Sequence, residues 1–281
     1  MNKKIDIKSV NKTANNMRLN ALELAFKAGK LGAHIGPSLS IIDILAVLYT
    51  SVLRFKIEDP FWNERDRFIL SKGHGGLGLY TALKEVQIIS EENLSTFEDD
   101  GGILSGQPQR NIKYGIEFAS GSLGMGLSLG VGVALSAIKK SLNYNTFILL
   151  GNGECNEGSI WEAALSASQL KLGNLICIID DNKMQSDGKS DEVLDMGNWE
   201  DKWNSFGFKS YKVNGHSPIE LFDCFNRCIN ESLDTPKVII ADTIKGYGVS
   251  LFENNPTWHH GIVTKDIFET ARDEIMKNNK D

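Results

Sequence analysis

Short apolar runs alternate along this chain with longer segments of helical periodicity. Five runs are continuous in apolar residues, as parallel strands buried on both faces of a sheet are. We therefore expect strands at 67–70, 146–150, 174–180, 209–213 and 237–242. The segments between and around them predict helices at 13–31, 40–53, 76–87, 122–141, 158–171, 217–231 and 265–278. This alternation predicts an α/β fold, a doubly wound and mostly parallel sheet flanked by helices, with ligands at the carboxyl ends of the strands.

The chain shows no internal repeat, low-complexity tract or linker, so we expect a single domain over 1–281. Segment 96–120 is rich in glycine and has no periodicity, which is more typical of an active-site loop than of a domain boundary. Glycine is also frequent elsewhere, with 27 residues clustered at 29–36, 73–78, 101–106, 121–132 and 151–158. Such clusters indicate tight turns and a close approach of the backbone to another group.

Charge and composition exclude several functional classes. The 30 Lys and Arg against 36 Asp and Glu give a net charge of −6, which argues against a nucleic-acid partner. No apolar run reaches the roughly 20 residues of a membrane span, and the charged N-terminus lacks the apolar core of a signal peptide. Four cysteines are too few for a disulfide scaffold, and Cys224 and Cys228 are better explained as buried residues on one helix face. We expect a cytoplasmic protein.

The strongest local motif is FILLGNGECNEG at 147–158, where a buried strand ends in Gly151-Asn152-Gly153 and a helix begins near Glu157. Glycine N–H groups and a helix N-terminus can close on a phosphate. The next strand runs into Asn182 and Met184. Adjacent parallel strands place Asn152 and Asn182 at one edge, where their amide oxygens and the Met184 carbonyl can hold a hard cation such as magnesium. Two loop-capping asparagines explain the same spacing equally well.

This arrangement resembles the thiamine diphosphate motif, which usually reads GDG with an asparagine about 30 residues later. Further segments are similar to the N-terminal subunit of a split transketolase, and the resemblance covers residues 10–265. They are DRFILSKGHGGLGLY at 66–80, ASGSLGMGLSLGVGVAL at 119–135, WEAALSASQLKLGNLICIIDDN at 161–182 and FENNPTWHHG at 252–261. The resemblance implies thiamine diphosphate as cofactor, held with Mg²⁺ (or Ca²⁺ or Mn²⁺).

The resemblance also implies roles for individual residues. His34 and His260 would be catalytic and would contact the substrate together with Gln107. Asn152, Asn182 and the Met184 carbonyl would bind the metal. Glu157 would lie behind the site, and His216 would be structural. The expected cofactor-binding residues are His74, Gly121, Ser122, Leu123, Gly153, Glu154, Asn182 and His260.

Two positions depart from the family pattern. Asn152 stands where relatives write the aspartate of GDG, so the metal site loses one negative charge and we expect weaker cation binding. Gln107 stands in Gly106-Gln107-Pro108 where transketolases usually have a histidine that contacts the donor substrate. Glutamine can form hydrogen bonds but cannot titrate, so the usual ketose donor is in doubt.

A transketolase also needs a pyrimidine-binding domain, and no second strand–helix module follows residue 265. We therefore expect that domain on a C-terminal partner subunit, in an α2β2 assembly. The predicted reaction transfers a two-carbon ketol unit from a ketose or ketose phosphate to an aldose, with sugars as substrates and neither nucleic acid nor membrane as partner. Two alternatives remain: the α-type subunit of a 2-oxo acid dehydrogenase, and a non-catalytic partner subunit with a weakened metal site.

Overall fold

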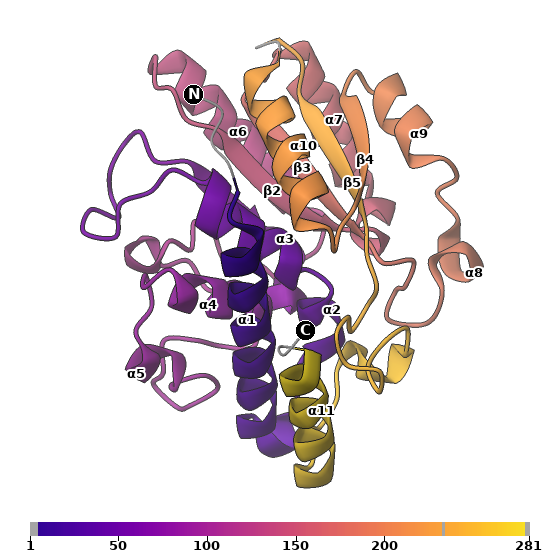
Figure 1. Ribbon diagram of the computed structural model, residues 1–281. Helices are drawn as coiled ribbons and strands as arrows, with labels where there is room; N and C mark the ends of the chain where they lie inside the picture. Colours follow the sequence, from indigo (N-terminus) through magenta and orange to yellow (C-terminus); the bar gives the residue numbers. More distant parts are fainter. Residues whose placement is uncertain (1–4, 232–233, 279–281) are drawn as a thin grey trace.

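The computed structural model describes residues 5–231 and 234–278 and is built on a parallel sheet of five strands (Figure 1). The strand order is β1-β2-β3-β5-β4, and every neighbouring pair is parallel. The bounds are β1 (Arg67–Leu70), β2 (Thr146–Gly151), β3 (Leu175–Asp181), β4 (Lys209–Asn214) and β5 (Lys237–Asp242). All five expected strands are confirmed, each to within one residue at either end, and so is the parallel α/β fold.

Consecutive residues of the central strands enter two separate hydrophobic clusters, one on each face of the sheet. In β3, Ile176 and Ile178 belong to the larger cluster, and Cys177 and Ile179 belong to the smaller one. Because both faces of this strand are covered, all of its positions are buried and its sequence is apolar without interruption up to Ile179. The edge strand β4 has one partner only and alternates between exposed and buried positions.

Helices cover both faces. Figure 1 shows α1 and α10 in front of the sheet and α6 and α7 behind it. The principal helices are α1 (Ile7–Lys27), α3 (Ile42–Val47), α4 (Gly76–Glu85), α6 (Gly126–Lys139), α7 (Gly158–Gln169), α10 (Pro218–Asn230) and α11 (Lys265–Asn278). The remaining α-helices of the described residues are α2 (Ile35–Leu39), α5 (Glu91–Leu94), α8 (Ser190–Leu194) and α9 (Trp199–Ser205).

Some helix limits differ from those that the sequence predicts. The helix expected at 13–31 begins at Ile7, because Asp6 caps it by accepting from the Ser9 N–H. The helix expected at 40–53 divides into α3 and a π-helical turn over Leu48–Val52. The helix expected at 122–141 begins only at Gly126, since 121–125 form a turn whose Gly121 and Gly124 have positive φ.

Candidate functional site

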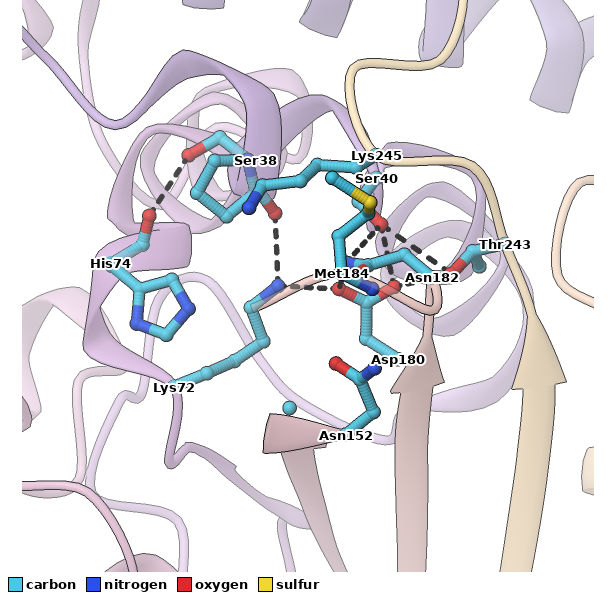
Figure 2. A network of polar contacts seen from close by, with 12 residues as sticks. Ser38, Ser40, Lys72, His74, Asn152, Asp180, Asn182, Met184, Thr243 and Lys245 are labelled. Carbon is cyan, nitrogen blue, oxygen red and sulfur yellow. Dashed lines mark hydrogen bonds and ion pairs between the residues drawn. The ribbon is translucent and has the colours of Figure 1, made fainter. Parts of the chain in front are cut away.

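The carboxyl ends of β2 and β3 bring Asn152 and Asn182 to the same edge of the sheet, as the sequence predicts. Gly151 pairs with Asp180 across the two strands, and the Asn152 N–H donates to the Asp180 carbonyl over 3.2 Å. Asn152 is 4% exposed and Asn182 is 5% exposed. Figure 2 shows Asn182 beside Met184, and Asn152 below Asp180 at the end of the neighbouring strand.

Each of these amides is held by its nitrogen. Asn182 Nδ2 donates to Asp180 Oδ2 over 2.9 Å and to Ser40 Oγ over 3.1 Å. Asn152 Nδ2 donates to Ser190 Oγ over 2.7 Å. Asn182 Oδ1 also caps the loop by accepting from the Met184 N–H over 3.0 Å. The oxygens of these two amides and the Met184 carbonyl are the donor set at this edge that fits a hard cation.

A buried ion pair lies directly beside these amides (Figure 2). Lys72 follows β1 and is 1% exposed; its Nζ pairs with Asp180 and donates to the Pro37 carbonyl over 3.0 Å. Asp180 also accepts from Ser40 and Thr243. Burial by itself would raise the pKa of Asp180, but the Lys72 charge and these hydrogen bonds outweigh it and hold the pKa below its usual value. The Asp180 carboxylate is therefore charged, and both of its oxygens already have hydrogen-bond or ion-pair partners.

Two further acids near this edge, Glu154 and Asp181, are also engaged with other groups. Glu154 is 2% exposed and accepts from Ser71 Oγ, from Gly124 N over 2.9 Å and from Gly151 N over 3.0 Å. Asp181 pairs with Lys183. Burial raises the pKa of both carboxyl groups. Within the described ranges no cluster of three or more His, Cys, Asp or Glu side chains can hold a metal, so the amide set is the candidate cation site.

Four histidines from three separate loops form one cluster. His34 precedes α2, His74 lies in the turn after β1, and His259 and His260 lie at the end of the turn over Pro256–His259. The His34 ring lies 4.5 Å from His260, 5.5 Å from His259 and 6.1 Å from His74, measured between ring centroids. The structure therefore unites His34, His74 and His260, as the sequence predicts, and adds His259.

Glycine at position 32 permits this approach. Gly32 has a φ of +69°, and a Cβ there would lie 2.8 Å from His260 Cε1. Ala33 and Gly261 exchange two backbone hydrogen bonds of 2.9 and 3.0 Å, which hold the two histidine-bearing loops together. A larger residue at position 32 would therefore separate His34 from His260.

The cluster is electropositive and contains neutral histidines. Lys245 Nζ lies 3.0 Å from His259 Nδ1 and donates to the Gln185 carbonyl over 2.9 Å. Burial, with help from Lys72, lowers the pKa of Lys245 to about 8. Burial, followed by the charges of neighbouring histidines and lysines, lowers the pKa of His34 to about 4 and that of His259 to about 3, and it also lowers the pKa of His74. Neutral imidazoles beside ammonium groups can accept protons while the lysines attract an anion.

Gln107 lies against the loop that begins α6. Gly121 has a φ of +133°, and a Cβ there would lie 1.8 Å from Gln107 Oε1, so only glycine allows this contact. Ser122 is exposed and Leu123 is partly exposed. Glu157 lies beside Gly124 of the same loop with its side chain exposed, and its place behind the site stays a prediction; Glu154 nearby is buried.

Three further residues have the structural role that the sequence predicts. His216 Nδ1 lies 2.8 Å from Asp43 Oδ2, and its Nε2 accepts from the Ile244 N–H over 2.9 Å. Cys224 and Cys228 are buried and free.

Four residues of the site were not predicted from the sequence: Lys72, Asp180, Lys245 and His259. Lys245 was predictable from the sequence, because it follows β5, whose carboxyl end lies at the same edge of the sheet as those of β2 and β3. The others are recognisable only once the loops that carry them are brought together.

A parallel sheet whose carboxyl edge carries an amide pair suited to a cation, buried lysines and clustered histidines defines a cofactor-binding domain of the diphosphate type. Residues 9–279 match the protein family described as "Transketolase, thiamine diphosphate binding domain". The chain belongs to this family, which confirms the resemblance. In the described part of the chain, no helix has the length and apolarity to cross a membrane.

Two relatives are similar in length to this chain. One, a subunit of an apulose-4-phosphate transketolase from Phocaeicola vulgatus, is 40% identical over 260 residues, covering 92% of this chain and 91% of the relative. Another, a subunit of a 6-deoxy-6-sulfo-D-fructose transketolase from Clostridium sp., is 37% identical, covering 94% and 95%. The transketolase structure from Campylobacter jejuni superposes with a TM-score of 0.89 at 27% identity, covering 97% of this chain and 43% of that one. The chain thus spans less than half of that solved transketolase.

The lowered histidine pKa values predict a pH dependence of stability. An unfolded histidine has a pKa of 6.5, whereas folded His34 has a pKa of about 4. Between these values the unfolded chain binds more protons, so the free energy of unfolding should fall as the pH drops from 6.5 to 4. In urea unfolding at pH 7 and pH 5, His34→Asn should lose less stability than the wild type over this interval. An equal loss in both proteins would contradict the lowered pKa of His34.

Proposed function

We propose that this chain is the thiamine diphosphate-binding N-terminal subunit of a two-chain transketolase, folded as one domain over 1–281. It acts with a pyrimidine-binding C-terminal subunit, in an α2β2 assembly, and transfers a two-carbon ketol unit from a ketose to an aldose. The observation that carries this proposal is the meeting of the histidine cluster with the amide and lysine edge of the sheet, in a chain that matches the family over 9–279.

The residues at the edge fit the charged end of the cofactor. Lys245 attracts the diphosphate, with help from the N–H groups after Asn152, while Asn152, Asn182 and the Met184 carbonyl hold a divalent cation, Mg²⁺ by preference. The predicted cofactor contacts of His74 and Gly121 lie on the loops that border this edge. The Glu154 carboxylate accepts hydrogen bonds from the Gly124 and Gly151 N–H groups and so holds the two glycine loops together. Its backbone is therefore the part that contacts the cofactor.

Thiamine diphosphate supplies the carbon nucleophile and the electron sink of the reaction. The chain itself supplies proton management. His34 and His260, with rings 4.5 Å apart, hold and move protons on substrate hydroxyl groups, and the low pKa of His34 keeps its ring neutral and able to accept a proton at neutral pH. Lys245 and His259 border the same space.

The donor sugar is of an unusual type. Gln107 presents an amide where a histidine is usual, and it rests against Gly121 at the cofactor loop. Two relatives are named for an apulose phosphate and for a sulfo-sugar, so this family includes subunits that serve specialised sugars. We expect a specialised ketose, handled in the cytoplasm, where the four free cysteines stay reduced.

Reconstitution tests the proposal. The chain alone should show no ketol transfer, whereas the chain co-purified with its C-terminal subunit should transfer a two-carbon unit from a ketose phosphate to an aldose, given thiamine diphosphate and Mg²⁺. Turnover by the chain alone would contradict the two-chain organisation. A complex that binds the cofactor but transfers nothing from a panel of ketoses would favour the non-catalytic alternative, for which the neutral Asn152 is the one supporting feature.

The histidine roles give a separate prediction. In the reconstituted complex, His34→Ala or His260→Ala should lower kcat by roughly 10²- to 10⁴-fold, the usual contribution of a positioned acid–base group. Affinity for thiamine diphosphate should change little in His34→Ala, whose side chain is not among the expected cofactor contacts, and somewhat more in His260→Ala, whose side chain is. Near-normal kcat in both variants would remove these residues from the catalytic set.

A further inference from the structure

The lysines at this edge of the sheet differ in the partners of their ammonium groups. Lys72 pairs with Asp180. Lys183 pairs with Asp181. Carboxylates therefore balance both of these charges. Lys245 is 1% exposed, yet in the part of the chain that the structure describes no carboxylate forms an ion pair with it. Its charge is thus left without a counter-ion from the described residues.

Neutral acceptors hold the ammonium of Lys245 instead. Its Nζ donates to the Gln185 carbonyl over 2.9 Å, and it lies 3.0 Å from His259 Nδ1. An ammonium can only donate, so the ring nitrogen that faces it presents a lone pair. Burial, followed by the Lys245 charge, lowers the pKa of His259 to about 3, which keeps the ring neutral near pH 7. Two of the three N–H bonds of Lys245 are therefore held without cancelling its charge.

Backbone contacts bring His259 and Lys245 together. The Asn254 N–H donates to the Lys245 carbonyl over 2.9 Å, so the loop that leaves Lys245 returns to it just before the turn over Pro256–His259. Asn255 caps this turn with its side chain. None of these bonds involves the His259 side chain. A substitution at position 259 therefore changes the atom that faces Lys245 while the loop keeps its backbone contacts.

We propose that His259 is a positioning residue for Lys245, which fixes the ammonium with a neutral acceptor and so keeps its positive charge available to an anion. The anion is the diphosphate of the cofactor, so this role rests on the proposed function. A carboxylate at position 259 would hold the ammonium but neutralise it, whereas an apolar side chain would keep the charge and release the ammonium on that side. Substitutions at this one position therefore separate the placement of Lys245 from its charge.

The test is isothermal titration of the full chain with pyrophosphate, the charged end of the cofactor, at pH 7 with Mg²⁺ present. Asn, Asp and Leu carry a neutral oxygen, a charged oxygen and a methyl group, each as many bonds from Cα as His259 Nδ1 is. His259→Asn should bind within about twofold of the wild type. His259→Leu should bind roughly fivefold more weakly, the scale of one neutral hydrogen bond. His259→Asp should bind at least roughly tenfold more weakly, the scale of a hydrogen bond to a charged group.

Two controls separate this role from a structural one. Thr257→Ala, at an exposed position of the same turn, should bind pyrophosphate as the wild type does. In a Lys245→Met background, His259→Asn and His259→Leu should bind pyrophosphate equally, because the ammonium through which they act is absent. A difference that persists in this background would mean that position 259 acts on the anion directly, and would overturn the positioning role.

The remaining outcomes distinguish this role from the proposed function. Wild-type affinity in both His259→Leu and His259→Asp would overturn the role of His259 and leave the diphosphate site intact. An equal loss in His259→Asn and His259→Leu would overturn it too, because a neutral acceptor would then not suffice. No saturable pyrophosphate binding by the wild type would overturn the diphosphate site on this chain and, with it, the role of His259.

Discussion

The candidate site depends on the buried ion pair between Lys72 and Asp180. The pair connects the loop after β1 with the end of β3, and the same carboxylate accepts hydrogen bonds from Ser40 before α3, from Thr243 after β5 and from Asn182. A charged pair this deeply buried is stable only when every remaining polar atom has a partner. Both Asp180 oxygens have partners and the Lys72 ammonium also bonds the Pro37 carbonyl, so the network fixes three loops at one edge of the sheet.

The charge balance of this edge differs from that expected of a carboxylate-based cation site. Asp180 is neutralised by Lys72, Asp181 is paired with Lys183, and the two side chains that we propose as cation ligands are neutral amides. Lys245 adds a further positive charge, reduced by its lowered pKa of about 8. On the proposed function, a site with this charge balance would take a divalent metal together with a diphosphate more readily than a free cation.

The sequence alone predicts much of this arrangement. The strands were predictable because their apolar runs are buried on both faces, and His34, His74 and His260 were found through their glycine-rich motifs. Lys72 and Asp180 were not predicted because their roles come from a contact across a long stretch of sequence, which no local pattern records. The start of α6 was misplaced because the positive φ of Gly121 and Gly124 delays the helix.

The most direct test of this account is a double-mutant cycle on the ion pair, read as the free energy of unfolding in urea. Asp180→Ala leaves the Lys72 charge buried without a partner, and Lys72→Ala does the same to Asp180, so each single variant should lose about 3–5 kcal/mol. The double variant should lose clearly less than the sum of the two, because it buries no charge. Single variants within about 1 kcal/mol of the wild type, or strictly additive losses, would contradict the claim that this pair organises the site.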